Sequence, residues 1–417
     1  MRQLLSLLAR VGAVLLVALL LLEGLAQAVW WQRDCVVLFG KELCLLPYPI
    51  LSESHLEILS NLEAAEREGS NYDQFDPILG WSVRPGSSTV KDGTPYESND
   101  IGVRARRIYT QIPPPGITRL AVFGPSFARA DDVALEDAWT YLMEQSRPDL
   151  EVMNWGVGGY GTDQAYLRYQ TQGAAYSPDI VIIVYEEENV RRNVNRYRPF
   201  FFPRTGIPLT KPVFVPKDEM LELLDNPFQS LAALRDTAVH APNRFLDTVC
   251  PHDFFCVREQ YEVSPLDVLK SYRFLHTLAF QVEYRDSLPV LTTWPDSYDD
   301  PLQTQVTLRL ISMFAETARQ NGSVPVVVFF AYRGTIDLYA AGETPMYHQL
   351  VHQIQAEGIH TLDLTPCFVE ANGQSTDFTP FFAPGGHYNE TGNRVVSDAI
   401  IDYLCQEGIL SRCTSSQ

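Results

Sequence analysis

Five short apolar runs, rich in β-branched residues and bounded by turn residues, are spread along the chain. They cover residues 119–123, 152–157, 180–185, 324–330 and 360–364. Runs of this length and composition are typical of strands buried on both faces of a parallel sheet. The intervening segments carry the apolar spacing of helices, over 134–145, 164–172, 302–319 and 393–406. The alternation predicts a three-layer α/β/α fold with a doubly wound, flavodoxin-like parallel sheet.

Two long segments lie outside this alternation. Residues 32–115 form a polar lead-in, punctuated by proline and glycine, with little sustained periodicity. An insertion of about 195–297 separates the third strand from the helix before the fourth, and we expect it to form a cap beside the site because a connection of that length needs structure or a function of its own. Its opening stretch, 195–204, is rich in arginine and aromatic residues. That stretch has two interpretations, packing onto the core or holding a sugar or a carboxylate. The α/β domain is then expected over 116–412.

The first 31 residues have a different character from the rest. An uncharged apolar run over 11–22 reaches the length of a membrane span when it is extended to Trp30 and Trp31, because a span needs about 20 residues. One interpretation is a signal-anchor with both tryptophans at the interface. The other is a signal peptide cleaved near Ala26-Gln27-Ala28. Both place residues 32–417 outside the cytoplasm, either as the domain of a single-pass membrane protein or as a secreted protein.

Cysteine spacing and net charge agree with an extracytoplasmic domain that has no nucleic-acid partner. Three cysteine pairs are close enough in sequence to close small loops in an oxidising compartment; they are Cys35/Cys44, Cys250/Cys256 and Cys405/Cys413. Cys367 is left over, and it is either free or takes the place of one of those partners, so the sequence leaves the connectivity open. No cysteine or histidine spacing is typical of a zinc site, so we expect neither a metal nor an organic cofactor. The net charge of −19 argues against nucleic-acid binding, which needs a basic surface.

Residues with the chemistry for acyl transfer follow four of the predicted segments. Ser126 follows the first strand, the glycine-rich stretch 156–161 the second, Asn189 the third, and a loop with His387 comes before the last helix. Ligands of doubly wound sheets bind beyond the carboxyl ends of the strands, so we expect these residues to meet. Acyl transfer needs a nucleophile, a base that removes its proton, and hydrogen-bond donors for the oxyanion.

The order and context of these residues resemble the SGNH/GDSL hydrolase superfamily. The resemblance covers about residues 95–410 and is most specific in the stretch N-W-G-V-G-G-Y-G-T-D-Q. It implies that Ser126 is the nucleophile and His387 the general base. It also implies an oxyanion hole made by Ser126, Gly159 and Asn189. The activity implied is ester hydrolysis or O-acyl transfer through an acyl-serine, on a carbohydrate or lipid ester.

The sequence departs from the pattern of this superfamily in three places. Pro125 stands where an aspartate usually precedes the serine, and Val190 follows Asn189 where an aspartate is frequent. Pro384 and Gly385 stand at the positions where an aspartate commonly precedes the histidine. The carboxylate that would orient His387 is therefore missing from its usual place. Asp377, ten residues upstream on the same loop, is one candidate for this role. A backbone carbonyl that orients a Ser–His dyad is the other.

These departures leave two further functions open. The first is a catalytically silent relative that binds a glycan or a partner protein through the same cleft, and it predicts that Ser126 and His387 do not come within hydrogen-bond distance. The second is a partner subunit for a membrane acyltransferase. The first would keep the shape of the cleft, and co-purification from membranes would support the second.

Overall fold

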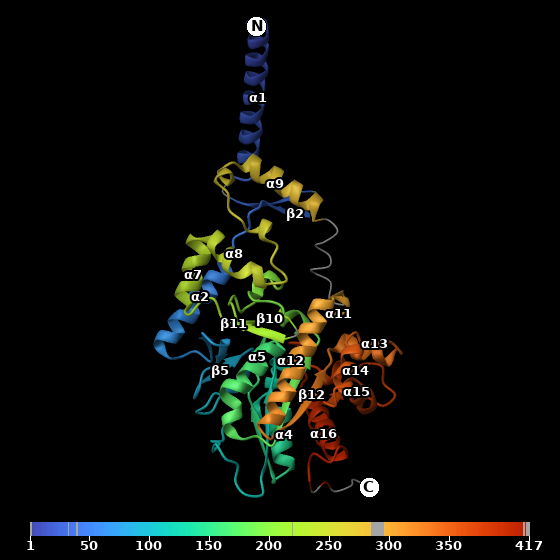
Figure 1. Ribbon diagram of the computed structural model, residues 1–417. Helices are drawn as coiled ribbons and strands as arrows, with labels where there is room; N and C mark the ends of the chain where they lie inside the picture. The colour runs from blue at the N-terminus through green and yellow to red at the C-terminus, as the bar shows by residue number, and fades with distance from the viewer. Residues whose placement is uncertain are drawn as a thin grey trace.

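A five-stranded parallel sheet forms the centre of the protein, in a computed structural model that describes residues 2–31, 33–38, 41–218, 220–284, 296–411 and 413 (Figure 1). All five predicted strands are confirmed, as β7 (Thr118–Phe123), β8 (Leu150–Asn154), β9 (Ile180–Glu186), β12 (Val324–Phe330) and β13 (His360–Asp363). Their order is β13-β12-β9-β7-β8, with every neighbouring pair parallel. Counted along the chain this is 2-1-3-4-5, the flavodoxin-like order.

Helices cover both faces of the sheet, as the predicted three layers require. On one face, α5 (Thr162–Arg168) and α12 (Pro301–Gln320) pack against residues such as Val327. On the other, α4 (Trp139–Ser146) and α16 (Glu390–Gln406) pack against residues such as Val328. Successive strand residues thus enter opposite cores, because side chains of a strand alternate between its two faces. Three helices that were not predicted lie beside β12 and β13: α13 (Arg333–Ala340), α14 (His348–Ala356) and α15 (Thr365–Ala371).

The lead-in has more regular structure than its weak periodicity indicated. Its helix α2 (Glu53–Glu68) begins at Ser52, whose side chain accepts a hydrogen bond from the backbone N–H of His55 at 3.2 Å. Such an N-cap satisfies one of the free N–H groups at a helix start. The lead-in also contains three two-stranded antiparallel sheets: β1 (Cys35–Leu38) with β2 (Lys41–Cys44), β3 (Asp73–Asp76) with β4 (Gly80–Val83), and β5 (Ser88–Lys91) with β6 (Thr94–Glu97).

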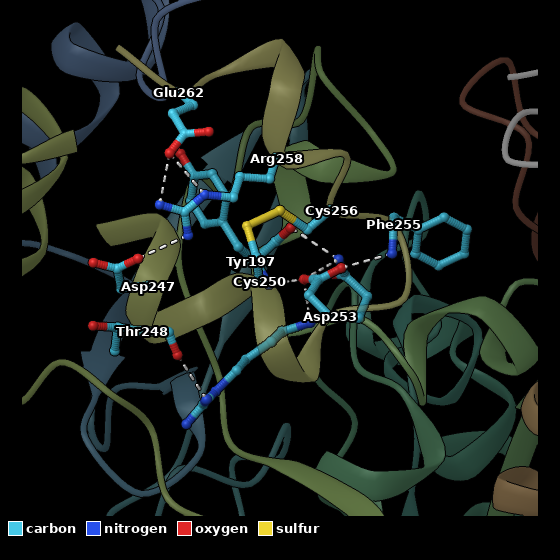
Figure 2. The surroundings of a disulfide bond; sticks show 11 residues. Tyr197, Asp247, Thr248, Cys250, Asp253, Phe255, Cys256, Arg258 and Glu262 are labelled. Atoms are coloured by element: carbon cyan, nitrogen blue, oxygen red, sulfur yellow. Dashed lines mark hydrogen bonds and ion pairs between the residues drawn. A yellow bond between two sulfur atoms is a disulfide. The ribbon is translucent and has the colours of Figure 1, made fainter. Parts of the chain in front are cut away.

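The insertion is also structured. Its elements are β10 (Val213–Lys217), β11 (Met220–Leu224), α7 (Leu231–His240), α8 (Pro242–Val249), α9 (Lys270–Glu283) and, beyond residues 285–295, α11 (Asp296–Asp299). The disulfide Cys250–Cys256 closes a short loop after α8 (Figure 2). Cys35–Cys44 and Cys405–Cys413 are also bonded, and Cys367 is free. The short-range pairing that the cysteine spacing suggested is the pairing that the structure has.

The N-terminal helix α1 (Arg2–Val29) projects from the body, and α9 lies across its base (Figure 1). Its span of 25 residues, Leu5–Val29, has a mean hydropathy of 2.6 and is unburied. The base of α1 is packed, because Trp30, directly after the helix, lies against Phe274 with the two rings tilted and their centroids 5.2 Å apart. The Glu23 carboxylate accepts hydrogen bonds from the backbone N–H groups of Lys270 and Ser271 at 3.1 and 2.9 Å. The end of α1 therefore packs on the first turn of α9. An apolar N-terminal helix and three disulfides are consistent with a location outside the cytoplasm.

Candidate active site

Ser126 and His387 meet at the carboxyl edge of the sheet. Ser126 begins the short helix α3 (Ser126–Arg129), directly after β7 and Gly124. Gly124 has φ 151°, and a Cβ there would lie 2.8 Å from the carbonyl oxygen of Val184, so the turn before the serine needs glycine. Nε2 of His387 lies 2.8 Å from Oγ of Ser126. This contact is the geometry that a serine nucleophile and its base require.

The ring of His387 is held by the residues on both sides of it. Phe127 packs against the imidazole with ring centroids 4.9 Å apart. The next residue, Tyr388, donates its hydroxyl to the carbonyl oxygen of Ala331 at 2.8 Å. Asn389 then caps α16 by accepting from the backbone N–H groups of its first turn. The loop that carries the histidine is thus tied to the core and to a helix start.

Asp132, and not Asp377, is the carboxylate that contacts His387. Oδ2 of Asp132 lies 2.9 Å from Nδ1 of the imidazole. Asp377 is exposed and accepts a hydrogen bond from the N–H of Thr379 at 2.9 Å. The sequence signal for Asp132 was weak, because it lies 255 residues from His387 along the chain and only six after Ser126.

The space at Gly385 explains how Asp132 reaches the histidine. A Cβ added at Gly385 would overlap Oδ2 of Asp132. The carboxylate from the first loop therefore fills the volume that a side chain at 385 would occupy. Asp132 adopts φ 70°, in the left-handed region, which aspartate tolerates better than most residues.

The charges around His387 favour a basic imidazole. Burial by itself lowers the pKa of His387, but the hydrogen bond with Asp132 and the negative charges of Asp131 and Asp132 raise it above its ordinary value. The hydrogen bond with His387 in turn lowers the pKa of Asp132. Asp132 is thus an anion at neutral pH, and it stabilises the imidazolium that forms when the ring takes a proton.

Of the three expected oxyanion donors, two lie at the cavity and one does not. Ser126 and Gly159 line the same cavity, and Gly159 has φ 78°, which glycine adopts without strain. Asn189 is fully buried, and its side-chain amide donates to Oγ1 of Thr162 at 3.2 Å. Glu188, one residue earlier, lines a second cavity beside Ser126. Side chains at successive positions after β9 point in different directions, and the sequence alone did not show which one faces the serine.

Two cavities, of about 860 and 660 Å³, meet beside Ser126. They share three lining residues, Ser126, Arg198 and Phe202. The larger one extends along the His387 loop to Tyr332, and the smaller one runs below α2 to Trp81. The lead-in and the insertion therefore build most of the walls of the smaller cavity, and the loops of the α/β domain build most of the walls of the larger one.

The acidic residues after β9 are already paired. Arg192 forms ion pairs with Glu186 and Glu188. Glu187 accepts a hydrogen bond from the N–H of Tyr332 at 3.0 Å, and burial raises its pKa to about 7. In the part of the chain that the structure describes, no group of three or more acidic, histidine or cysteine side chains is arranged to hold a metal ion.

No protein-family model and no curated protein matches the sequence. Solved structures do match in fold. A putative lipolytic protein of the G-D-S-L family from Desulfitobacterium hafniense is 12% identical, with a TM-score of 0.31, over 69% of this chain and 99% of its own. A G-D-S-L family member from Veillonella parvula is 10% identical, with a TM-score of 0.34, over 68% and 97%. An acetyl xylan esterase is 12% identical, with a TM-score of 0.35, over 68% and 98%. The protein is thus similar in fold to GDSL/SGNH lipolytic proteins and esterases.

Proposed function

We propose that the protein is a serine esterase or O-acyltransferase that works through an acyl-serine. The observation that carries the proposal is the pair of contacts from Ser126 to His387 and from His387 to Asp132, at 2.8 and 2.9 Å. Nε2 of His387 removes the proton from Oγ of Ser126 as that oxygen attacks the ester carbonyl. Asp132 holds the ring in the tautomer that leaves Nε2 free to accept the proton and stabilises the charge that results.

The tetrahedral intermediate then collapses to the acyl-serine. The proton on Nε2 passes to the departing alcohol oxygen, and the C–O bond of the ester breaks. Water or an acceptor hydroxyl next gives its proton to His387 and attacks the acyl carbon. The bond from the acyl carbon to Oγ of Ser126 then breaks, and His387 returns the proton to that oxygen. The first acceptor gives hydrolysis and the second gives O-acyl transfer. A carbohydrate or lipid ester is the substrate class proposed.

The backbone N–H groups of Ser126 and Gly159 are the proposed oxyanion donors. Neither makes a hydrogen bond to another described residue. The Ser126 N–H stands at the first position of α3, where a helix leaves its N–H groups without internal partners. Donors that are already in place stabilise the developing charge without having to reorganise.

We also propose that α1 is retained as a membrane anchor, with the rest of the chain outside the cytoplasm. The signal-peptide alternative would cut near residues 26–28, between Glu23 and Trp30. Glu23 accepts hydrogen bonds from the first turn of α9, so cleavage would remove this contact of the folded domain, whereas Trp30 and its contact with Phe274 would remain. Residues 1–31 would then be the anchor, 32–115 the lead-in and 116–412 the hydrolase-like domain with its insertion.

The silent binding module is the weaker alternative. It predicted that Ser126 and His387 would not meet, and they lie 2.8 Å apart. No feature of the described residues favours a partner subunit for an acyltransferase over an enzyme.

Labelling with a fluorophosphonate tests the activated serine. The full chain in detergent is expected to be labelled, and Ser126→Ala and His387→Ala are expected to lose the label. His348→Ala is the matched control, because His348 is an exposed histidine on α14 that does not line either cavity beside the serine, and it should label like the wild type. A folded wild-type chain that takes no label would contradict the proposal.

A further inference from the structure

Arg198 is a buried cation beside Ser126 that has no carboxylate partner. Its side chain is 7% exposed. Nε donates to Oγ1 of Thr205 at 2.9 Å and Nη1 to the carbonyl oxygen of Gly159 at 3.0 Å. Among the described residues, no carboxylate oxygen lies within 4.0 Å of its guanidinium. Taking a charged group out of water without a partner is costly, so its position requires an explanation.

The other cations of the two cavities are compensated. Arg192 is paired with two glutamates. In the smaller cavity, Lys91 pairs with Asp73 at 2.6 Å and Arg129 with Asp131 at 2.5 Å. Arg333 is half exposed to solvent and lies 3.9 Å from Asp337. Arg198 is therefore the buried cation of this site that contacts no carboxylate of the described residues, although the charges of Glu188 and Glu186 act on it from beyond 4.0 Å.

The electrostatic surroundings favour an anion at this point. Burial and the neighbouring charge of Arg192 lower the pKa of Arg198 to about 10, although the charges of Glu188 and Glu186 oppose them. The chain as a whole carries a net charge of −19, so a positive site at the junction of its cavities is a local exception. An incoming anion would offset both the burial and the repulsion from Arg192.

The backbone before Arg198 is fixed by a buried carboxylate in the disulfide loop (Figure 2). Oδ2 of Asp253 accepts hydrogen bonds from the N–H groups of Arg196 and Tyr197, both at 2.7 Å. Asp253 lies between Cys250 and Cys256, whose disulfide closes the loop. Arg198 thus begins a short helical turn whose entry is held in place, and little ordering is left to do when a ligand binds.

We propose that Arg198 binds a carboxylate or phosphate group on the same molecule whose ester Ser126 attacks. This inference rests on the proposed function for the position of the ester. A guanidinium has five N–H donors, of which two are used by Thr205 and Gly159. The remaining donors lie beside two cavities that both reach the serine, and a planar guanidinium suits the two oxygens of an anionic group. The substrate is then an acylated acidic sugar or a phosphorylated ester.

The test compares three acetyl esters on one sugar ring. They are mono-O-acetyl methyl glucoside, the glucuronoside with a carboxylate at C6, and the 6-phosphate. The full chain is expected to hydrolyse at least one of the two anionic esters with a kcat/KM at least about tenfold above that of the neutral ester, the discrimination typical of a hydrogen bond to a charged group. Which of the two is preferred identifies the anion.

The Arg198→Gln variant is expected to reduce that preference to less than about threefold. Arg204→Gln, an exposed arginine on the same segment, should keep the preference. Equal loss on the neutral and anionic esters in Arg198→Gln would overturn the inference, because it would mean that Arg198 acts on the oxyanion or only holds Gly159. A wild-type chain without any preference would overturn it as well.

A binding measurement separates this inference from the proposed function. Calorimetry on the full chain compares the binding of a β-1,4-glucuronate tetramer with that of cellotetraose, which lacks the C6 carboxylates. Inorganic phosphate is titrated as a third probe. We expect the wild type to bind an anionic probe more tightly than cellotetraose and Arg198→Gln to lose the difference. Anion binding without turnover would contradict the enzyme and keep the anion site. Serine labelling without anion binding would support the enzyme and contradict the anion site.

Discussion

The carboxylate of Asp132 lies 2.9 Å from the imidazole of His387, in the volume that a side chain at Gly385 would fill. The two loops thus share one carboxylate position, which either could supply. In this chain Asp132, on the loop after the serine, supplies the carboxylate, and Gly385, on the histidine loop, has no side chain and leaves space for it. The missing aspartate before the histidine is therefore a change in where the carboxylate comes from, and the contact itself is kept.

The Asp132→Asn substitution is expected to lower kcat about 10³- to 10⁴-fold, because the amide would present a donor to Nδ1 and favour the wrong tautomer of the ring. The loss is measured as initial rates on a short-chain aryl ester, with circular dichroism as the check on folding. Asp377→Asn is the matched control and should keep the wild-type rate, since Asp377 is exposed and contacts Thr379. A similarly large loss of kcat in Asp377→Asn would mean that Asp377 acts in the site.

Exchanging the two positions is a sharper test. Gly385→Asp alone should lower kcat, because the new side chain would overlap that of Asp132. The double variant Asp132→Gly/Gly385→Asp is expected to have a kcat at least about tenfold above that of Asp132→Gly, because the aspartate at 385 would place a carboxylate where that of Asp132 was. Glycine is also suited to the left-handed backbone at 132. Rates of the single and double variants decide the matter, and a double variant no faster than Asp132→Gly would contradict a shared position.

The reaction is expected to need the neutral form of His387, because a protonated ring cannot accept the serine proton. Its pKa is raised above the ordinary value of about 6.5. A plot of kcat/KM against pH should therefore rise with a midpoint above about 6.5. In Asp132→Asn the midpoint should move to lower pH, because the carboxylate that favours the charged ring is gone. An unchanged midpoint would mean that another group controls the profile.

The Gly159→Ala substitution is expected to reduce kcat by about tenfold or more. Its backbone has φ 78°, and the new Cβ would lie 3.0 Å from Cδ1 of Ile207 and 3.2 Å from Nη1 of Arg198. The N–H proposed as an oxyanion donor would have to shift. Gly342→Ala is the control, because Gly342 has φ 94° with nothing within 4 Å. It should cost about 1 kcal/mol of stability and leave kcat unchanged; similar kinetics in both variants would contradict a role for Gly159.

Substitutions of Trp30 and Trp31 are a matched pair that tests the packing at the base of α1. Trp30 is 5% exposed and packs on Phe274, whereas Trp31 is 68% exposed. Trp30→Ala should cost the extracytoplasmic domain about 3 kcal/mol and Trp31→Ala less than about 0.5 kcal/mol, measured as thermal unfolding of the full chain in detergent. Intact mass of the membrane-bound protein should include residues 1–31. A mature chain that begins near residue 29 would favour the signal peptide.

The parts of this protein that its sequence determined are those with a local cause. Four strands of the sheet are short runs, rich in apolar residues, that are buried on both faces. The cysteine spacing offered three short-range pairs, and the structure decided that these are the pairs that form. Ser126 and His387 could be singled out because the residues immediately around them carry the pattern. The helix α2 was missed because its apolar positions stand among many charged ones, so its periodicity became evident only once the surface it packs on was known.

Only the tertiary structure decided which distant groups complete the site. Asp132 reaches His387 across 255 residues of sequence, and Asn189 turns away from the cavity that its neighbour Glu188 lines. Arg198 comes to Ser126 from the insertion, along a segment that Asp253 holds. Such contacts depend on how loops from separate elements pack at one edge of a sheet. Local patterns carry no record of that packing, because a shift of one residue points a side chain in a different direction.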